Sequence, residues 1–245
     1  MLLIGYFLLL IITIMSKLLV LIAASALTMT AANAMPLAGF AQQYSGENTS
    51  AASYTLPTAD KEGISVDFTF SFTGTTQTGA LEDNDYLGFW FGNSTGPSIG
   101  LKANCGGGTN CTNDVYVRLG GTDGVFVPNS NLTPGTNYRV FGYLYKTNGS
   151  AVYNNFDAWL NPTASETVTL LGADARAMPG VSLAGTTALT SVQTVGFRTS
   201  GLDKGVTVNV TSVDLNVNAV PEPSSLALIG LAMAGLGLAR RRKQA

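Results

Sequence analysis

The chain has 245 residues, of which 46% are hydrophobic and only 11% are charged. It contains no histidine, which excludes Ser-His-Asp and Cys-His catalysis and every zinc or iron site with a histidine ligand. All 15 acidic residues lie between Glu47 and Glu222, together with eight of the 13 Lys and Arg residues, so this stretch has a net charge of about −7. A surface of that sign repels nucleic acid, and no nucleic-acid partner is expected.

The N-terminal segment, residues 2–34, is apolar apart from Lys17 and a few small polar residues. In one interpretation, residues 2–15 belong to a long membrane anchor. In the other, Met15 is the true start, and a basic residue and an apolar core lead to a small-residue box at Ala32-Asn33-Ala34, as in a secretory signal peptide. The second interpretation accounts for more residues and predicts export through the general secretory machinery.

This interpretation divides the chain into three parts. Residues 1–34 form a signal segment with a helical core, and cleavage is expected between Ala34 and Met35. Residues 35–219 form the exported domain, and residues 220–245 form a C-terminal tail with its own composition.

The central domain shows the period of two that is typical of half-buried strands. Apolar residues alternate with polar residues from Val66 to Phe72, and a longer aromatic strand is expected over Tyr138–Tyr145. The alternation from Val206 changes phase at Thr211-Ser212, which predicts a bulge or a bend. The polar stretch 41–64 is expected to be a loose arm that adds an edge strand.

Short strands separated by Gly, Asn, Pro and Asp clusters predict an all-β fold, a β-sandwich of the jelly-roll type. Only Thr167 to Met178 suggests a short helix, which Gly172 weakens. Several segments carry aromatic residues in a suggestive order, and these are 87–91, 99–102, 115–118, 140–146 and 156–162. In strand order and aromatic placement this pattern resembles the concanavalin A-like, or laminin-G-like, jelly rolls.

The two cysteines, Cys105 and Cys111, are separated by five residues of which three are glycine. In an exported chain a disulfide is the expected state of such a pair. A bound metal is the alternative, but two thiolates without further ligands make a poor zinc site.

The acidic cluster Glu82-Asp83-Asn84-Asp85 is the main candidate for chemistry. Glycosidases of this sandwich class place carboxylates on one strand face as Glu-x-Asp-x-Glu, and this chain has no such strand, so no enzymatic activity and no catalytic residue are expected. Oxygen ligands from Asp83, Asn84 and Asp85, joined by Asp123, are instead candidates for Ca²⁺. The alternative is a solvated turn, and no other cofactor is expected.

Trp90 and Trp159 are candidates for stacking on sugar rings. Each also lies in an apolar run, so packing in the core is the alternative explanation for both.

The C-terminal tail begins with Pro221-Glu222-Pro223 and ends with Arg240-Arg241-Arg242-Lys243. Between them, residues 224–239 are uncharged and number 16, about 24 Å as a helix against a bilayer core of about 30 Å. A short transmembrane helix is therefore expected, with the basic cluster stopping transfer on the cytoplasmic side. The central domain then lies on the other side of the membrane.

This order of motif, span and basic cluster resembles the PEP-CTERM sorting signal of Gram-negative bacteria, from Val220 to Gln244. The resemblance implies recognition by an exosortase, a membrane-embedded cysteine transpeptidase-like enzyme, with cleavage near the Pro-Glu-Pro motif. It also implies passage through the inner membrane to the cell surface or extracellular matrix. The alternative is an ordinary tail-anchored protein with a chance Pro-Glu-Pro.

The sequence thus predicts a non-enzymatic surface or matrix protein, associated with the exopolysaccharide or biofilm of a Gram-negative cell. A carbohydrate-binding lectin and a glycan hydrolase acting through Asp83 and Asp85 are the alternatives from other functional classes.

Overall fold

The computed structural model describes residues 34–46, 50–73, 85–105, 111–120, 124–147, 149–169, 180–185, 187–202 and 206–217. Apart from Ala34, these residues belong to one compact unit, Met35–Ala245. The predicted apolar core of the signal segment, the Pro-Glu-Pro motif, the C-terminal span and the basic cluster lie outside the described residues. Among the residues that are described, no helix has the length and apolar character needed to cross a membrane.

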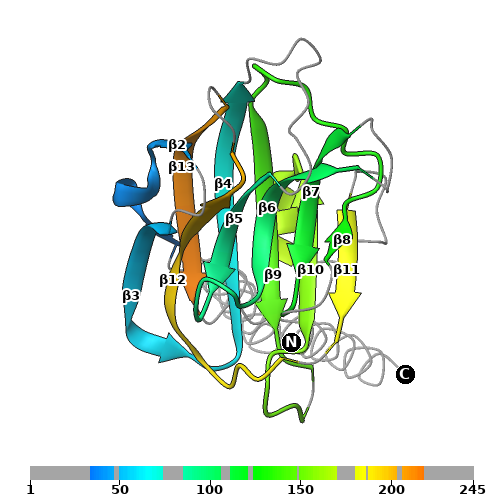
Figure 1. Ribbon diagram of the computed structural model, residues 1–245. Helices are drawn as coiled ribbons and strands as arrows, with labels where there is room; N and C mark the ends of the chain where they lie inside the picture. The colour runs from blue at the N-terminus through cyan, green and yellow to red at the C-terminus, as the bar shows by residue number, and fades with distance from the viewer. Residues whose placement is uncertain are drawn as a thin grey trace, which may run out of the picture. The chain divides into compact units, whose positions relative to one another are not determined.

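The described elements are almost all strands (Figure 1). Their bounds are β1 Ala34–Pro36, η1 Ala38–Phe40, β2 Gln43–Ser45, β3 Ser50–Asp60, β4 Gly63–Thr73, β5 Tyr86–Phe91, β6 Ser98–Asn104, β7 Thr112–Arg118, β8 Val125–Phe126, β9 Tyr138–Tyr145, β10 Asn155–Leu160, α2 Ala164–Thr169, β11 Gly180–Ala184, β12 Val192–Ser200 and β13 Thr207–Val217.

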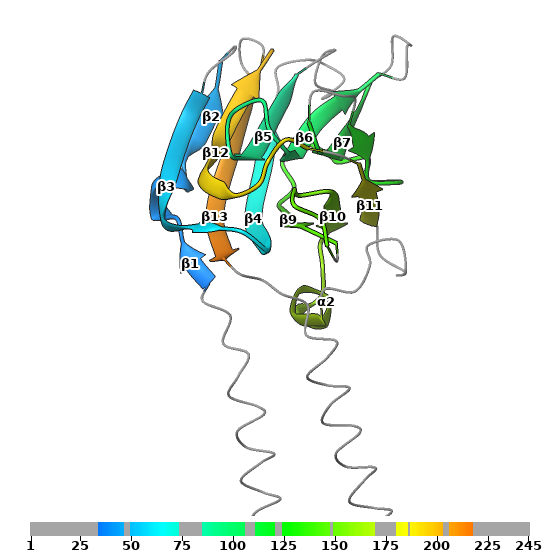
Figure 2. The same ribbon diagram turned by 90° about the horizontal axis from the view of Figure 1, so that it is seen from below.

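The strands form two sheets that pack face to face (Figure 2). Sheet A has seven strands in the order β1-β13-β4-β9-β10-β11, with β2 also paired to β13. Sheet B has six strands in the order β3-β12-β5-β6-β7-β8. Antiparallel pairs such as β4–β9 and β5–β12 build both sheets, so the fold is an all-β sandwich of the jelly-roll type, as predicted.

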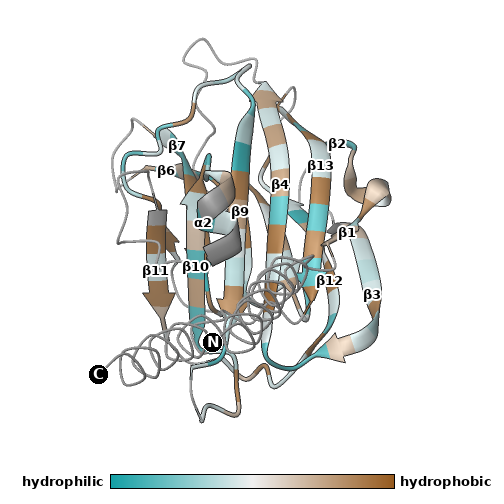
Figure 3. Ribbon diagram, turned by 180° about the vertical axis from the view of Figure 1, so that it is seen from behind, coloured by the Kyte–Doolittle hydropathy of each residue, from teal (hydrophilic) through white to brown (hydrophobic). Residues whose placement is uncertain are grey.

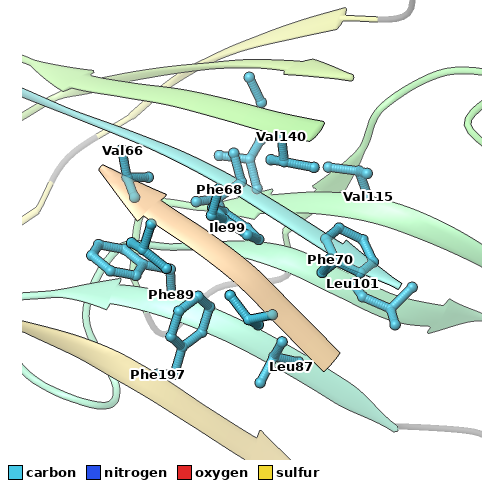
Figure 4. Packing of buried hydrophobic residues seen from close by; sticks show 14 of the residues in the cluster. Val66, Phe68, Phe70, Leu87, Phe89, Ile99, Leu101, Val115, Val140 and Phe197 are labelled. Atoms are coloured by element: carbon cyan, nitrogen blue, oxygen red, sulfur yellow. The ribbon is translucent and has the colours of Figure 1, made fainter. Parts of the chain in front are cut away.

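The core lies between the two sheets because apolar side chains alternate inward along almost every strand. In β4, the inward residues from Ile64 to Phe72 are at most 1% exposed, and the residues between them are mostly more exposed. Sheet B contributes Leu87, Phe89 and Phe197 from the opposite side, and Figure 4 shows these side chains beside those of β4. A single core therefore holds both sheets.

The structure confirms two local predictions. The register between β13 and β4 shifts between Val210 and Ser212, at the predicted bulge. The stretch 41–64 supplies β3, which pairs with β12 at the edge of sheet B. The arm is not loose, because Tyr44 and Leu56 are each 2% exposed within the core.

The short helix begins earlier than predicted, at Ala164. Thr163 and Glu166 form a capping box, in which the Glu166 carboxylate accepts from the Thr163 N–H at 2.7 Å and the Glu166 N–H donates to the Thr163 hydroxyl at 3.3 Å. Figures 2 and 3 show α2 beside the outer face of sheet A, near β9 and β10. The rest of the predicted helix, after Thr169, lies outside the described residues.

Candidate functional site

The structure leaves the calcium prediction untested. Asp83, Asn84 and Asp123 lie outside the described residues. Asp85 is described and is 2% exposed, and its carbonyl accepts a hydrogen bond from the Ala103 N–H at 2.9 Å. Within the described ranges no group of three or more acidic or cysteine residues is placed to hold a metal ion.

The predicted disulfide is confirmed: Cys105 is bonded to Cys111. It closes the turn between β6 and β7, beside a hydrogen-bonded cluster around Asp114. The Asp114 carboxylate accepts from the Thr112 hydroxyl at 2.7 Å and the Asn104 amide at 2.9 Å. On its other oxygen it accepts from the Ser130 hydroxyl at 2.7 Å and the Asn131 N–H at 2.6 Å. This end of the hairpin is therefore rigidly held.

The two tryptophans lie on opposite faces of the sandwich. Trp159 is on the outer face of sheet A, 0% exposed, with its ring centroid 5.3 Å from that of Phe141. A ring with no exposed surface cannot stack on a sugar, so the stacking prediction is corrected for Trp159, which has a packing role. Trp90 is on the outer face of sheet B and is 5% exposed, so its indole is almost entirely packed within that face.

The outer face of sheet B brings together residues that are far apart in the sequence. Alternation places Leu87, Phe89 and their neighbours inward, so the intervening side chains point outward. The register aligns three rows across strands β12, β5, β6 and β7. These rows are Gly196-Trp90-Ser98-Arg118, Arg198-Gly88-Gly100-Tyr116 and Ser200-Tyr86-Lys102-Asp114.

We call the aromatic and basic members of these rows the cationic face, defined as Tyr86, Trp90, Lys102, Tyr116, Arg118 and Arg198. Figure 1 views the molecule from the side of sheet B, to which this face belongs. Phe126 of β8 extends the middle row, because it pairs with Tyr116. Tyr86, Lys102, Arg118, Arg198 and Phe126 are half-buried, so each keeps some exposed surface.

Glycines on neighbouring strands allow the rings of Trp90 and Tyr116 to pack close to the backbone of sheet B. A Cβ atom at Gly196 would be 2.6 Å from Cε2 of Trp90, and one at Gly88 would be 3.3 Å from Cζ of Tyr116 and closer to its hydroxyl. The two rings thus occupy the space that side chains on the neighbouring strands would otherwise fill. The aromatic members are in contact as well, since the ring centroids of Tyr86 and Tyr116 are 6.0 Å apart.

The three cations of this face have no carboxylate partner among the residues that the structure describes. No ion pair joins Lys102, Arg118 or Arg198 to an acidic group within the described residues. Arg198 donates to the Ser94 carbonyl at 3.4 Å, and its guanidinium carbon lies 5.9 Å from the Tyr86 ring centroid, in cation–π range. Asp114, beside Lys102, is the one carboxylate in the three rows, and its oxygens already accept four hydrogen bonds.

Two buried donors on the cationic face lack hydrogen-bond acceptors. They are the indole N–H of Trp90 and the Nε–H of Arg118, which lie at opposite sides of Ser98 in one row. A buried donor without an acceptor costs about 1–3 kcal/mol, and native proteins contain few such groups. The two donors lie on β5 and β7, on either side of β6.

Burial raises the pKa of Tyr116 to about 12, despite a hydrogen bond with Ser98 and the nearby positive charge of Arg118. The phenol is therefore neutral at physiological pH and acts as a hydrogen-bonding and packing group. In Asp114, burial opposes ionisation, but the donors Ser130, Thr112, Asn104 and Asn131 outweigh it and hold the pKa below its ordinary value of 3.8.

Several solved structures are similar to the chain in their overall arrangement. The alginate lyase Aly36B has a TM-score of 0.45 and 13% identity, covering 72% of this chain and 80% of the lyase. The carbohydrate recognition domain of Emp47p has a TM-score of 0.41 and 9% identity, covering 72% and 88%. CG-16, a homodimeric agglutinin from chicken liver, has a TM-score of 0.36 and 9% identity, covering 67% and 98%. No curated protein matches the sequence.

The tail gives the clearest identification. Residues 219–243 match the PEP-CTERM protein-sorting motif, which spans the Pro-Glu-Pro motif, the apolar run and the basic cluster. This match indicates export, sorting to the cell envelope or surface, and processing by an exosortase. The chain therefore carries a PEP-CTERM protein-sorting motif at residues 219–243, which implies processing by an exosortase, and its central domain is a jelly-roll β-sandwich.

Proposed function

We propose that this protein is a non-enzymatic component of the cell surface or extracellular matrix that binds glycan through the cationic face. The observation that carries this proposal is the pair of buried donors without acceptors, Trp90 Nε1 and Arg118 Nε, within a cluster of aromatic side chains. Sugars present hydroxyl oxygens as acceptors and C–H surfaces that pack on rings. Tyr86 and Phe126 are half-buried, so each keeps some exposed surface for such packing.

Sorting to the surface gives this face access to extracellular polysaccharide. We propose the exopolysaccharide matrix of a Gram-negative cell as the setting, reached through the inner membrane. The signal segment 1–34, the domain 35–219 and the tail 220–245 are the three parts on which this route depends.

The chemistry of the face favours binding over catalysis. Glycoside hydrolysis needs two carboxylates on either side of the bond, and within the three aligned rows Asp114 stands alone with its oxygens engaged. Tyr116, with a pKa raised to about 12, is a poor general base at neutral pH. Both features support a lectin-like role in preference to the hydrolase alternative.

A binding assay tests the proposal directly. The exported protein is purified from the producing cells and titrated with polysaccharides of differing composition while its tryptophan fluorescence is recorded. We expect saturable binding that is weakened by Tyr86→Ala, with no release of reducing ends from any polysaccharide. Binding that is unaffected by this substitution would place the ligand elsewhere, and catalytic turnover would contradict the non-enzymatic role.

The sorting route has a separate test. The intact mass of the mature protein is expected to correspond to a chain that begins at Met35 and ends near Pro221. Replacing Pro221, Glu222 and Pro223 with Ala is expected to leave an unprocessed form in the membrane fraction. A mature species that keeps Arg240 to Lys243 would indicate a stable anchor instead.

A further inference from the structure

We propose that the ligand of the cationic face is an acidic polysaccharide, whose anionic groups are bound by Arg118, Arg198 and Lys102. This inference rests on the proposed glycan-binding function and names the chemical class of the glycan. Four features of the described residues support it: charge, burial, spacing and the geometry of the arginine side chains.

The charge of the face is opposite to that of the domain around it. The stretch from Glu47 to Glu222 has a net charge of about −7, yet three of its eight basic residues lie on this one face. Asp114 is the only carboxylate in the same rows. Its two oxygens accept four hydrogen bonds from residues at the β6–β7 end of the protein. A face of net positive charge on an acidic protein attracts an anionic ligand.

The burial of the cations favours a ligand over solvent as their partner. Arg118 and Arg198 are half-buried, and no carboxylate of the described residues pairs with either. Burying a cation without a counter-charge is unfavourable, whereas a partly desolvated cation binds an incoming anion more strongly than an exposed one does. A neutral sugar would satisfy the donors but leave this charge uncompensated.

The spacing of the cations fits an extended chain and not a single sugar. Arg198 on β12 and Arg118 on β7 are separated by three strand spacings, about 14 Å at 4.8 Å per strand. Lys102 on β6 lies between those two strands and in a different row from either arginine. That distance exceeds one pyranose ring, so one monosaccharide cannot reach all three cations. A polymer with repeated anionic groups that crosses the strands can.

The side-chain geometry of Arg118 fits an anionic oxygen pair. Its Nε–H is buried and lacks an acceptor, and a carboxylate can accept from Nε and a terminal nitrogen of one guanidinium together. The Trp90 indole N–H in the same row supplies a further donor. The arrangement therefore suits a carboxylate or sulfate placed near Ser98.

The experiment compares the binding of four polymers to the mature exported protein, purified from the producing cells. Polygalacturonate carries carboxylates, dextran sulfate carries sulfates, dextran is neutral, and polyglutamate is a polyanion without sugar. Binding is measured by isothermal titration over a range of salt concentrations, with the wild-type protein and with the variants Arg118→Gln, Arg198→Gln and Lys61→Gln. Lys61 lies in the exposed β3–β4 turn and is the charge-matched control.

We expect polygalacturonate or dextran sulfate to bind, with affinity falling as salt increases, while dextran and polyglutamate bind at least about tenfold more weakly. Arg118→Gln and Arg198→Gln should each weaken binding by about tenfold or more, and Lys61→Gln should leave it unchanged. Melting temperatures of the variants establish that they are folded, and the salt series on the wild-type protein tests the inference without any substitution.

The outcomes separate this inference from the proposed function. Equal binding of dextran and polygalacturonate would overturn the acidic specificity and leave glycan binding intact. Equal binding of polyglutamate would show a general polyanion surface and overturn the glycan assignment. Binding of none of the four polymers, at any salt concentration, would contradict both proposals.

Discussion

The outer faces of the two sheets differ in how their charged side chains are paired within the described residues. On sheet A, Arg139 is paired with Asp67, donating from Nε to Oδ1 at 2.9 Å, and the Ser182 hydroxyl bonds to Asp157. On sheet B, Lys102, Arg118 and Arg198 have no such carboxylate partners within the described residues. The pairing of charges therefore distinguishes the two faces, and the proposed ligand would bind the face whose cations have no carboxylate partner among the described residues.

The aromatic residues of the two outer faces do not differ in this way. On sheet A, the rings of Tyr143 and Tyr145 stack at 4.6 Å with an interplanar angle of 9°, Tyr145 is half-buried, and Trp159 is fully buried. On sheet B, Tyr86 and Phe126 remain half-buried. Aromatic content alone therefore does not identify a binding face. The pairing of the charges around the rings is what separates the two faces.

The largest expected effect on stability comes from the core that lies between the two sheets. Phe197 is fully buried, and its ring centroid lies within 6 Å of those of Phe40, Tyr44, Phe68 and Phe89. Phe197→Ala should lower the free energy of unfolding by about 3–5 kcal/mol, measured by urea denaturation. A loss below about 1 kcal/mol would show that the two sheets do not depend on one core.

A smaller loss is expected from Gly196→Ala, which acts on the face of sheet B. The added Cβ would lie 2.6 Å from Trp90 Cε2 and would also press on the Ala52 carbonyl, so the indole must move. We expect a loss of about 1–3 kcal/mol in the free energy of unfolding and weaker glycan binding. Gly120→Ala is the matched control, because a Cβ there meets nothing within 4 Å. Similar losses in both variants would argue against packing of Trp90 on Gly196.

Local patterns in the sequence predicted the elements of the fold but not its candidate site. Alternation from Val66 to Phe72 and the phase change at Thr211-Ser212 are properties of one strand, so they can be read directly. The capping box of Thr163 and Glu166 was a further readable signal for the start of α2 that the prediction overlooked.

The cationic face was not predicted because it depends on long-range strand pairing. The alternation around Val115 and Val117 indicates that Tyr116 and Arg118 share the opposite face. Nothing local indicates that β12 pairs with β5, which brings Arg198 into the same row as Tyr116. The sequence singled out Trp90 as a sugar-binding candidate because it is a tryptophan. Its place in the cationic face depends on its neighbours on β12 and β6, which the sequence does not indicate.

The ion pair of sheet A offers a third and smaller test. The Arg139 and Asp67 side chains are 38% and 22% exposed, so solvent screens their attraction. A double-mutant cycle with Arg139→Gln and Asp67→Asn should give a coupling energy below about 1 kcal/mol that decreases with added salt. Neither variant should change glycan binding. A change in binding as large as that caused by Arg118→Gln would remove the distinction between the two faces.

The smallest effect concerns Asp114 and appears only in acid. Hydrogen bonds hold its pKa in the folded protein below the ordinary value of 3.8, despite burial. A depressed pKa contributes stability that is present above about pH 4 and is lost as the pH falls through the folded pKa, because the unfolded chain binds the proton first. Ser130→Ala removes one donor to this carboxylate, so it should raise the pKa and reduce that contribution. Unfolding free energies of the two proteins should therefore converge as the pH falls from 5 toward 2, roughly the range in which a paired Asp titrates. A difference that stays constant over this range would mean that Ser130 stabilises the β6–β7 end through its bonds to the Val127 carbonyl and the Val115 N–H, and not through Asp114.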